Sequence, residues 1–428
     1  MESLEVTNFL TIRQATLEVK PFTILIGPQA NGKSVMAKLL YFFRTFLTVQ
    51  YIQSIENQET KRQLERAGLE KFEQFFPRYT WIDQEFKLIY RYDDSEISVF
   101  RQTQSAKKSI LKLDYSPNLA ELHRKTKSHY RRKLEESKEV AERANIRQFE
   151  IFYQTLNDYI YTTPIARIFH NSVFIPAGRS FFANLQKNVF SFLANNIAID
   201  PLIKAFGSVY ESSKANYDRR PATRTVDPDF LVFRDELKQE IDKILAGQYK
   251  YEDDQDWIVT GRRRINLANA SSGQQEALPL LTVISMWLYY SGRGARQRTN
   301  FFIEEPEAHL FPISQRRLVG IFSKLYHRYN HHFLLTTHSP YVLTAINNLI
   351  MASNIVQEKG QNVVEPIKAI IGKDAPIQFV DVSAYTIQDG VLTSILDKEA
   401  TLIGSSVIDS VSDEFDRVFD ALMELELS

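Results

Sequence analysis

A short loop with a glycine at each end constrains the fold of this chain more than any other feature. The residues before it, 22–26, are apolar and predict a buried strand. The residues after it, 35–47, contain neither glycine nor proline and predict a helix. Glycines allow the backbone angles at which consecutive N–H groups turn inward around a phosphate at a helix N-terminus. The strand, loop and helix therefore occur in the order that a phosphate-binding loop requires.

The loop residues themselves fit this interpretation. They are Gly27, Pro28, Gln29, Ala30, Asn31, Gly32, Lys33 and Ser34. In such a loop the lysine reaches the β- and γ-phosphates of a nucleotide, and the serine hydroxyl binds Mg²⁺. The alternative is a glycine turn that arose by chance, which the flanking strand and helix make the weaker interpretation.

Composition limits the class of protein. At 428 residues the chain is longer than a single core usually supports, so one elaborated domain or two domains are expected. Lys plus Arg and Asp plus Glu both number 52, so the overall charge does not indicate a nucleic acid or an anionic membrane as partner. The absence of cysteine excludes disulfides, thiolate zinc sites and cysteine nucleophiles. No stretch has the roughly 18 uncharged apolar residues of a membrane span, so we expect a soluble, cytoplasmic protein.

A second stretch that could bind phosphate precedes an apolar helix predicted over residues 278–290. Small residues at a helix start leave N–H groups free to receive an anion, which we expect to be a γ-phosphate. The residues of this stretch are Ser271, Ser272, Gly273 and Gln274.

Carboxylates and a histidine follow two further predicted strands. Glu304 and Glu305 come directly after the apolar residues 301–303, and His338 follows residues 333–337. We expect Glu304 to bind Mg²⁺ through water and Glu305 to orient or deprotonate the attacking water. His338 would contact the γ-phosphate and the water. Singly, such residues are more often structural, but α/β sheets place ligands at the carboxyl ends of strands, where all of them are predicted.

Together these motifs resemble the ABC-type ATPase heads of the SMC, RecF and OLD families, within the AAA-family ATPases. Residues 303–312 and 336–341 look like the OLD-type variant, which is also found in ATPases of bacterial anti-phage systems such as Septu and PARIS. The resemblance covers residues 1–50 and 260–350. It implies an α/β P-loop NTPase fold with a mixed central sheet and a large, mostly helical insertion.

The resemblance also implies how the site works. ATP and Mg²⁺ would be bound by two protomers that share their sites, because Ser271 and Gly273 correspond to the signature motif that touches the γ-phosphate held by the opposite subunit. The protein would be a homodimer or a higher oligomer. Two positions depart from the usual pattern: Glu304 stands where many ABC ATPases have Asp, and Ser272 where a glycine is common. No Q-loop glutamine is identified, and residues 174–179 are its nearest counterpart.

The C-terminal part lacks the Toprim nuclease domain of OLD proteins. It has no Asp-x-Asp pair with metal-ligand spacing, and the pair His331–His332 lacks the flanks of an HNH nuclease. Short strands are predicted over 363–371, 384–387 and 391–396, followed by a helix over 413–427. A nuclease would therefore be a separate chain.

The predicted organisation has five parts. Residues 1–50 are the first part of the ATPase lobe, 51–165 an insertion with a hairpin and long helices, and 166–260 a connecting helical subdomain. Residues 261–350 carry the signature, the two glutamates and the histidine, and 351–428 complete the head.

A basic run lies within the insertion. It consists of Arg124, Lys125, Lys127, Arg131, Arg132 and Lys133, and it is followed by Glu135, Glu136, Glu139 and Glu142. The run predicts either a solvated helix with i,i+4 ion pairs or a contact with a nucleic-acid backbone.

The sequence thus predicts a cytoplasmic ATPase that dimerises around ATP and controls a partner effector, a nuclease in anti-phage defence. One alternative is a DNA repair or chromosome-maintenance ATPase that binds DNA directly through the basic run and residues 262–264. A transporter subunit is a weaker alternative, because the insertion of roughly 210 residues is far longer than ordinary connections. A scaffold that binds ATP without hydrolysing it is a further one.

Overall fold

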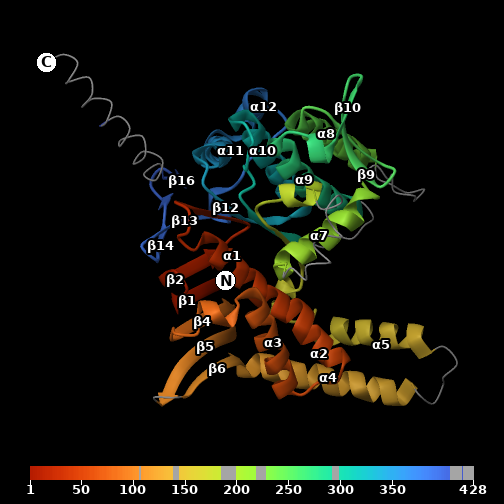
Figure 1. The fold of residues 1–428 in the computed structure, drawn as a ribbon, viewed down its shortest axis with the longest axis vertical. Coiled ribbons are helices and arrows are strands. Elements are labelled where there is room, and N and C mark those ends of the chain that lie inside the picture. Colours follow the sequence, from red (N-terminus) through yellow and green to blue (C-terminus); the bar gives the residue numbers. More distant parts are fainter. Residues whose placement is uncertain are drawn as a thin grey trace.

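The structure is a computed structural model that describes residues 1–105, 108–137, 144–184, 199–217, 228–291, 298–404 and 417. One large sheet crosses the molecule (Figure 1). Its strands, from one edge to the other, are β6 (Lys108–Tyr115), β5 (Ser95–Ser105), β4 (Phe86–Tyr92), β1 (Glu2–Phe9), β2 (Ile12–Val19), β14 (Val391–Ser394), β13 (Val382–Gln388), β3 (Phe22–Ile26), β12 (His332–Thr337), β11 (Thr299–Glu304) and β7 (Asn171–Ile175).

The sheet is mixed. Strands β13, β3, β12, β11 and β7 run parallel to one another, whereas β6, β5, β4, β1 and β2 pair antiparallel. The five residues of β3 are all buried, as expected for a strand with helices on both faces. Ile24 packs into one hydrophobic core cluster and its neighbour Leu25 into the other, so a core lies on each face of the sheet.

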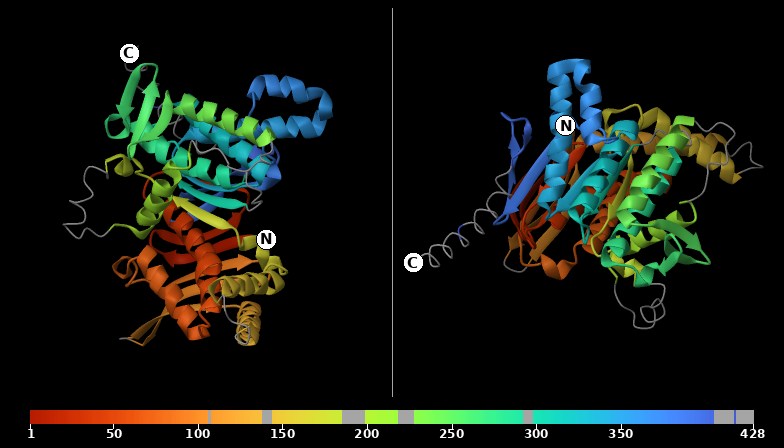
Figure 2. Two further views of the ribbon diagram at one scale, coloured as in Figure 1. Left: turned by 90° about the vertical axis from the view of Figure 1, so that its right-hand side faces the viewer. Right: turned by 90° about the horizontal axis from the view of Figure 1, so that it is seen from above.

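Two groups of helices build these cores. The first, with β4–β6 in the lower half of Figure 1, contains α1 (Lys33–Thr45), α2 (Ile52–Glu56), α3 (Lys61–Phe75), α4 (Pro117–Ser137) and α5 (Ala144–Tyr159). The second, in the upper half, contains α7 (Pro201–Lys214), α8 (Pro228–Leu245), α9 (Ser272–Ser291), α10 (Pro312–Tyr329), α11 (Pro340–Lys359) and α12 (Val364–Ile371). Helices α4 and α5 form a hairpin that extends from the body, and α11 and α12 form a second projecting pair (Figure 2).

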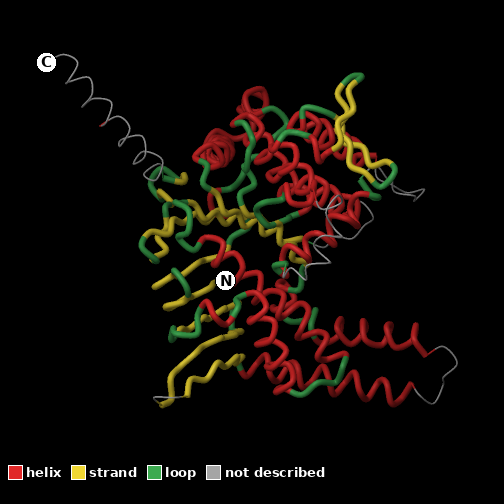
Figure 3. The backbone as a smooth tube through the Cα atoms, in the orientation of Figure 1, coloured by secondary structure: helices red, strands yellow, loops and turns green. Residues whose placement is uncertain are grey.

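Smaller strands complete the fold. Strands β8 (Gln248–Glu252), β9 (Gln255–Thr260) and β10 (Arg263–Asn266) form a separate antiparallel sheet, and β15 (Leu396–Asp397) pairs with β16 (Leu402–Ile403). Figure 3 shows the small sheet beside the second group of helices. None of the helices in the described part of the chain combines the length and the hydropathy that a membrane crossing requires.

One local prediction needs correction, and another is extended by the structure. Residues 364–371, predicted as a strand, form helix α12, because Ile367 and Ile371 recur at helical spacing and both are buried. The hairpin expected within residues 51–165 is present as the antiparallel pair β4 and β5. Strand β4 also pairs with β1, so this hairpin extends the central sheet, which was not predicted. Of the remaining expectations, the helix over 413–427 except residue 417, Glu139, Glu142 and most of residues 181–198 lie outside the described residues.

The basic run lies on α4. Lys125, Arg131 and Arg132 form i,i+4 ion pairs with glutamates of the same helix, at N–O distances of 2.7, 3.1 and 3.8 Å. Lys127 instead donates a hydrogen bond to the carbonyl oxygen of Glu59, at 2.7 Å. These contacts favour a solvated helix over a nucleic-acid contact.

Candidate nucleotide-binding site

Four neighbouring parallel strands end at the same edge of the sheet, and each is followed by predicted site residues. The strands lie in the order β3, β12, β11, β7. The phosphate loop follows β3, His338 follows β12, Glu305 follows β11, and residues 176–179 follow β7. The fold therefore gathers segments that are more than 300 residues apart in the sequence at the position where α/β sheets bind ligands.

The phosphate loop has the backbone that its glycines were expected to permit. Gly27 and Gly32 have φ angles of 143° and 94°, which L side chains rarely adopt. A Cβ atom at Gly32 would also lie 2.9 Å from side-chain atoms of Thr11 and Ile12. The Asn31 side chain donates to the carbonyl oxygen of Ile387 at 3.2 Å, which ties the loop to strand β13. The loop residues Pro28, Gln29 and Ala30 are exposed.

Lys33 is folded back onto its own loop. Its ammonium donates to the carbonyl oxygens of Gly27 and Pro28, at 2.8 and 2.6 Å, and the residue is only 5% exposed. Burial lowers the pKa of Lys33, and the nearby carboxylates of Glu305 and Glu307 oppose this shift. Anionic phosphate is a stronger acceptor for this cation than a neutral carbonyl oxygen, so a nucleotide could draw the ammonium out of the loop.

Glu305 and His338 lie beside each other across strands β11 and β12. Glu305 Oε1 is 3.5 Å from His338 Nε2, and both side chains are partly exposed, to 42% and 28%. Glu305 has a φ of 44°, in the left-handed region that non-glycine residues seldom occupy. Such strain persists where surrounding contacts impose it and is often found in active sites. Here the N–H of Glu305 donates to the carbonyl oxygen of Thr336 at 2.8 Å.

Glu304 and Ser34 fit a magnesium site. Glu304 is 6% exposed; its Oε2 accepts a hydrogen bond from the N–H of Ala177 at 3.2 Å, whereas its Oε1 is buried without a partner. Ser34 is exposed at the start of α1. Within the described part of the chain no three His, Cys, Asp or Glu residues are grouped so that they alone could hold a metal. The donors present suit Mg²⁺ bound jointly by one or two side chains and nucleotide phosphates.

Glu307 supports His338 and was not predicted from the sequence. Its Oε1 accepts hydrogen bonds from the Thr337 hydroxyl and from the backbone N–H of His338, both at 2.7 Å. Its second carboxylate oxygen is buried without a partner. The Ser339 hydroxyl donates to Gln315 Oε1 at 2.5 Å, which fixes the following turn to helix α10. The signal that could have identified Glu307 is its place two residues after Glu305, directly beyond the end of strand β11.

Arg179 is the second residue that sequence reasoning missed. It is fully buried and donates to the carbonyl oxygens of Glu304 and Glu305, at 2.7 and 2.8 Å. Burial lowers the pKa of its guanidinium, while neighbouring carboxylates, Glu276 first, oppose the shift. The stretch 174–179, predicted to lie near a Q-loop, thus reaches the site through an arginine.

The signature stretch begins helix α9 with a capping box. The N–H of Ser271 donates to Gln274 Oε1 at 3.1 Å, and the N–H of Gln274 donates to the Ser271 hydroxyl at 3.4 Å. Ser271 and Ser272 are exposed. A Cβ atom at Gly273 would lie 2.7 Å from the carbonyl oxygen of His309, so glycine allows the helix to approach the loop after β11 closely.

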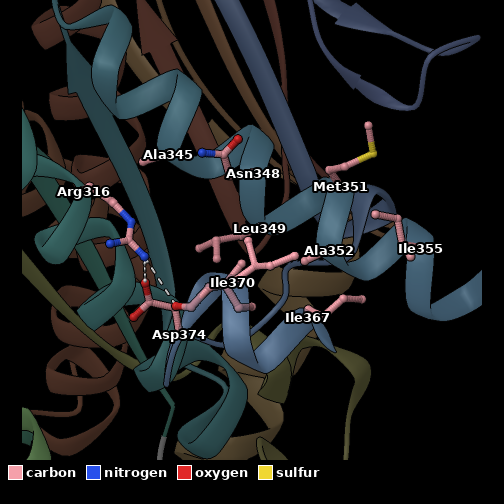
Figure 4. A pocket seen from close by; sticks show the side chains of 11 residues that line it. Arg316, Ala345, Asn348, Leu349, Met351, Ala352, Ile355, Ile367, Ile370 and Asp374 are labelled. Atoms are coloured by element: carbon pink, nitrogen blue, oxygen red, sulfur yellow. Dashed lines mark hydrogen bonds and ion pairs between the residues drawn. The ribbon is translucent and has the colours of Figure 1, made fainter. Parts of the chain in front are cut away.

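A separate groove lies between α11 and α12 (Figure 4). It has a volume of about 360 Å³ and a mainly aliphatic lining that includes Leu349, Ile367 and Ile370. Its arginine, Arg316, is paired with Asp374 at 3.6 Å. This chemistry does not suit a nucleotide triphosphate, so the strand edge is the better candidate site.

A family model matches part of the chain. Residues 180–343 match a family model described as an AAA ATPase domain, and this match supports ATP hydrolysis, so the chain is an ATPase. The matched range contains the signature stretch, both glutamates and His338, and it begins after the phosphate loop. No curated protein matches the chain.

Solved structures that resemble the chain include SMC head domains. One is the SMC head domain from Thermotoga maritima, with 12% identity, a TM-score of 0.36, and coverage of 92% of this chain and 97% of that chain. Another is an SmcHead bound to the C-winged helix domain of ScpA, with 10% identity, a TM-score of 0.36, and coverage of 94% and 99%. A third, the Smc head domain derived from Pyrococcus furiosus with an extended coiled coil, has 11% identity, a TM-score of 0.34, and coverage of 96% and 100%.

The prediction of an ATPase with an α/β P-loop fold is confirmed. The OLD-type and anti-phage assignments stay predictions.

Proposed function

We propose that this chain, an ATPase whose residues 180–343 match an AAA ATPase domain, closes as a homodimer around ATP and thereby controls a separate effector protein. The observation that carries the proposal is the meeting of the phosphate loop, the paired glutamates and His338 at the ends of three adjacent parallel strands. That arrangement holds a triphosphate and an attacking water within reach of the same side chains.

Within one protomer, each residue has a defined task in hydrolysis. The loop N–H groups cradle the β-phosphate, and Lys33 exchanges its two carbonyl acceptors for phosphate oxygens. Glu305 accepts the proton of the attacking water as it approaches the γ-phosphate, and His338 orients the water and donates to the γ-phosphate. Ser34 and Glu304 would hold Mg²⁺, which neutralises charge on the phosphates when bound.

The second protomer would complete the site through its signature stretch. Ser271 and Ser272 are exposed at the start of a 20-residue helix, where N–H groups and the helix dipole favour an anion. Large apolar side chains that follow Glu305 and His338 in the sequence are also exposed: Phe311 to 76%, Ile313 to 43% and Tyr341 to 54%. Exposed aromatic and aliphatic groups beside a polar site are typical of an interface. We propose that a second copy covers them.

The effector is the least direct part of the proposal. Its support is that the motifs resemble those of ATPases in anti-phage systems. We therefore propose that the ATPase acts in the cytoplasm and regulates a nuclease encoded as a separate chain. Co-purification of a nuclease with the tagged chain would test this, and a partner embedded in a membrane would contradict it.

Two variants test the ATPase dimer. Lys33→Ala is expected to abolish nucleotide binding. Glu305→Gln is expected to keep binding, to lower turnover by about 100-fold or more, and to accumulate an ATP-bound dimer. Phosphate release and light scattering with and without ATP measure both effects. Unchanged turnover of the Glu305→Gln protein would refute the role of Glu305, and a monomer at saturating ATP in that variant would refute the shared site.

A further inference from the structure

We propose that Arg179 and Glu276 form a buried clamp that couples Glu305 in one nucleotide site to the signature helix serving the other site of the dimer. Arg179 is a positioning residue, because its side chain acts through the backbone carbonyl groups of Glu304 and Glu305. The inference rests on the proposed function, since the coupling between sites requires that two protomers share them.

The guanidinium of Arg179 fastens the end of strand β11. It donates to the carbonyl oxygens of Glu304 and Glu305 at 2.7 and 2.8 Å, and also to that of Pro176 at 3.0 Å. The side chain of Glu304 in turn accepts from the N–H of Ala177 at 3.2 Å. The loop after β7 therefore holds both the backbone and the side chain of the strand that carries the paired glutamates.

The same arginine fastens the start of helix α9. Its Nε donates to the carbonyl oxygen of Glu276 at 2.9 Å and lies 3.5 Å from the Glu276 carboxylate. That carboxylate also accepts hydrogen bonds from the N–H groups of Arg179 and Ser180, at 2.9 and 3.0 Å. Glu276 is 3% exposed and lies within two turns of Ser271. The clamp thus joins the signature stretch to the loop after β7.

Glu305 depends on this attachment for its conformation. Its φ of 44° is unfavourable for a residue with a side chain, so neighbouring contacts must impose it. The N–H of Glu305 is held by Thr336 on one side, and its carbonyl oxygen is held by Arg179 on the other. A shift of Arg179 would release the carbonyl oxygen and let the Glu305 side chain leave its place beside His338.

The two attachments make one rigid connection. When ATP held by the partner pulls on the signature stretch, α9 can move only if Glu276 moves, and Glu276 is hydrogen-bonded to Arg179. Arg179 holds the backbone of Glu305, which serves the ATP held in the same protomer. Occupancy of one site would therefore set the geometry of the carboxylate in the other. A lysine cannot replace this arginine, because its single ammonium lacks the planar fork that reaches four separate carbonyl groups.

The test uses purified heterodimers with a different affinity tag on each subunit. Glu305→Gln in one subunit leaves both sites able to bind ATP but only the site of the other subunit able to hydrolyse it. Arg179→Lys is then added either to the subunit with intact Glu305 or to the subunit with Glu305→Gln. In the second arrangement the changed clamp reaches the active site only through the signature helix.

The proposal predicts that turnover falls by about tenfold or more in both arrangements, whereas the KM for ATP changes by less than about threefold. Glu276→Gln should reproduce both effects. Lys214→Met is the matched control, since it breaks another buried ion pair, Lys214–Asp256 at 3.0 Å, between α7 and the small sheet. The control heterodimer should keep its turnover even if its melting temperature falls as far as that of the Arg179→Lys protein.

Three results would overturn the proposal. Full turnover in the second arrangement would mean that Arg179 holds Glu305 but does not couple the sites. Full turnover in both would mean that it has no role in positioning. Equal losses in Lys214→Met and Arg179→Lys would assign the effect to stability. If the heterodimer without Arg179→Lys fails to form with ATP, the shared site itself is refuted, which the light-scattering experiment above shows separately.

Discussion

Replacing Lys33 by methionine should remove about half or more of the stabilisation that ATP gives to the protein, while changing the ligand-free protein little. Lys33 is 5% exposed and its ammonium makes two hydrogen bonds to loop carbonyls, so the lysine is already desolvated before ATP arrives. Methionine has a similar volume and no charge to bury. It also removes the unfavourable burial that lowers the Lys33 pKa, which offsets the lost hydrogen bonds.

The size of the effect follows from linkage. At an ATP concentration 100 times the Kd, binding stabilises the native state by about 2.7 kcal/mol. For 428 residues the unfolding entropy is about 0.9 kcal/mol/K, so the Tm of the unchanged protein should rise by about 3 °C. A hydrogen bond to a charged group contributes about 1.5 to 3 kcal/mol, which is roughly a 10- to 150-fold loss of affinity. The Lys33→Met protein should then gain only about 0.3 to 1.4 kcal/mol at the same ATP concentration.

Differential scanning fluorimetry with and without ATP measures this difference. The control is Lys38→Met, one turn further along α1, whose ammonium pairs with Asp200 at 3.2 Å and should leave the ATP-induced shift intact. A Lys33→Met protein that keeps the full shift would refute the contact with phosphate. A ligand-free Tm that falls by more than the whole ATP-induced shift would show that Lys33 is mainly structural.

Four further outcomes are expected. Gly32→Ala should lower the ligand-free Tm more than Gly372→Ala does, because both glycines have positive φ but only at Gly32 would the new Cβ meet neighbours, at 2.9 Å; equal losses would contradict this. Phe311→Ser should raise the concentration of protein needed for ATP-dependent dimers without changing ATP binding by the monomer, as measured by light scattering and titration; an unchanged dimer would place the 76% exposed ring outside the interface. Glu307→Gln should lower turnover by about tenfold in a phosphate-release assay, because the amide disturbs the acceptor of Thr337 and of the His338 N–H; undiminished turnover would remove Glu307 from the site. Acid should destabilise the protein, because burial lowers the pKa of His331 from 6.5 to about 4. As the pH falls, His331 of the unfolded chain takes up a proton before His331 of the folded chain does. The contribution of His331 to the free energy of unfolding is therefore complete above pH 6.5 and is lost as the pH falls towards 4, by about 2 kcal/mol between pH 7 and 5. Denaturant titrations should show that the free energy of unfolding falls less between pH 7 and 5 in the His331→Phe protein than in the unchanged protein; an equal fall would contradict the assignment to His331.

The parts of the site that could be predicted from the sequence are those with local signals. The phosphate loop, the signature stretch and the strand-end glutamates each combine a residue type with an adjacent strand or helix, and those elements formed where the pattern placed them. Parallel strands then bring their carboxyl ends together by rule. The ATPase activity and the P-loop fold followed from these signals.

The parts that could not be predicted depend on contacts between distant segments. Arg179 donates to the backbone carbonyl oxygens of Glu304 and Glu305, which lie 125 and 126 positions further along the sequence. Every residue has a backbone carbonyl group, so the sequence cannot indicate which one Arg179 will contact. The pairing of β4 with β1 also cannot be predicted from the local sequence, because an alternating pattern predicts a strand but not which strand it pairs with. The strand predicted over residues 363–371 is wrong, because Ile367 and Ile371 recur at helical spacing and are buried on one face of α12.

The position of β13 bears on how a nascent chain becomes active. Strands β2 and β3 follow each other directly in the sequence, yet they are separated in the sheet by β13 and β14, which come from residues 382–394. The loop after β3 also contacts β13: the Asn31 side chain donates a hydrogen bond to the carbonyl oxygen of Ile387, and Gly27 lies close to Thr386. During translation some 350 residues must therefore follow β3 before β13 and β14 can insert between β2 and β3. Until then the phosphate loop lacks its contact with Ile387. Full support of the nucleotide-binding loop thus arrives only after residues 382–394 have been synthesised.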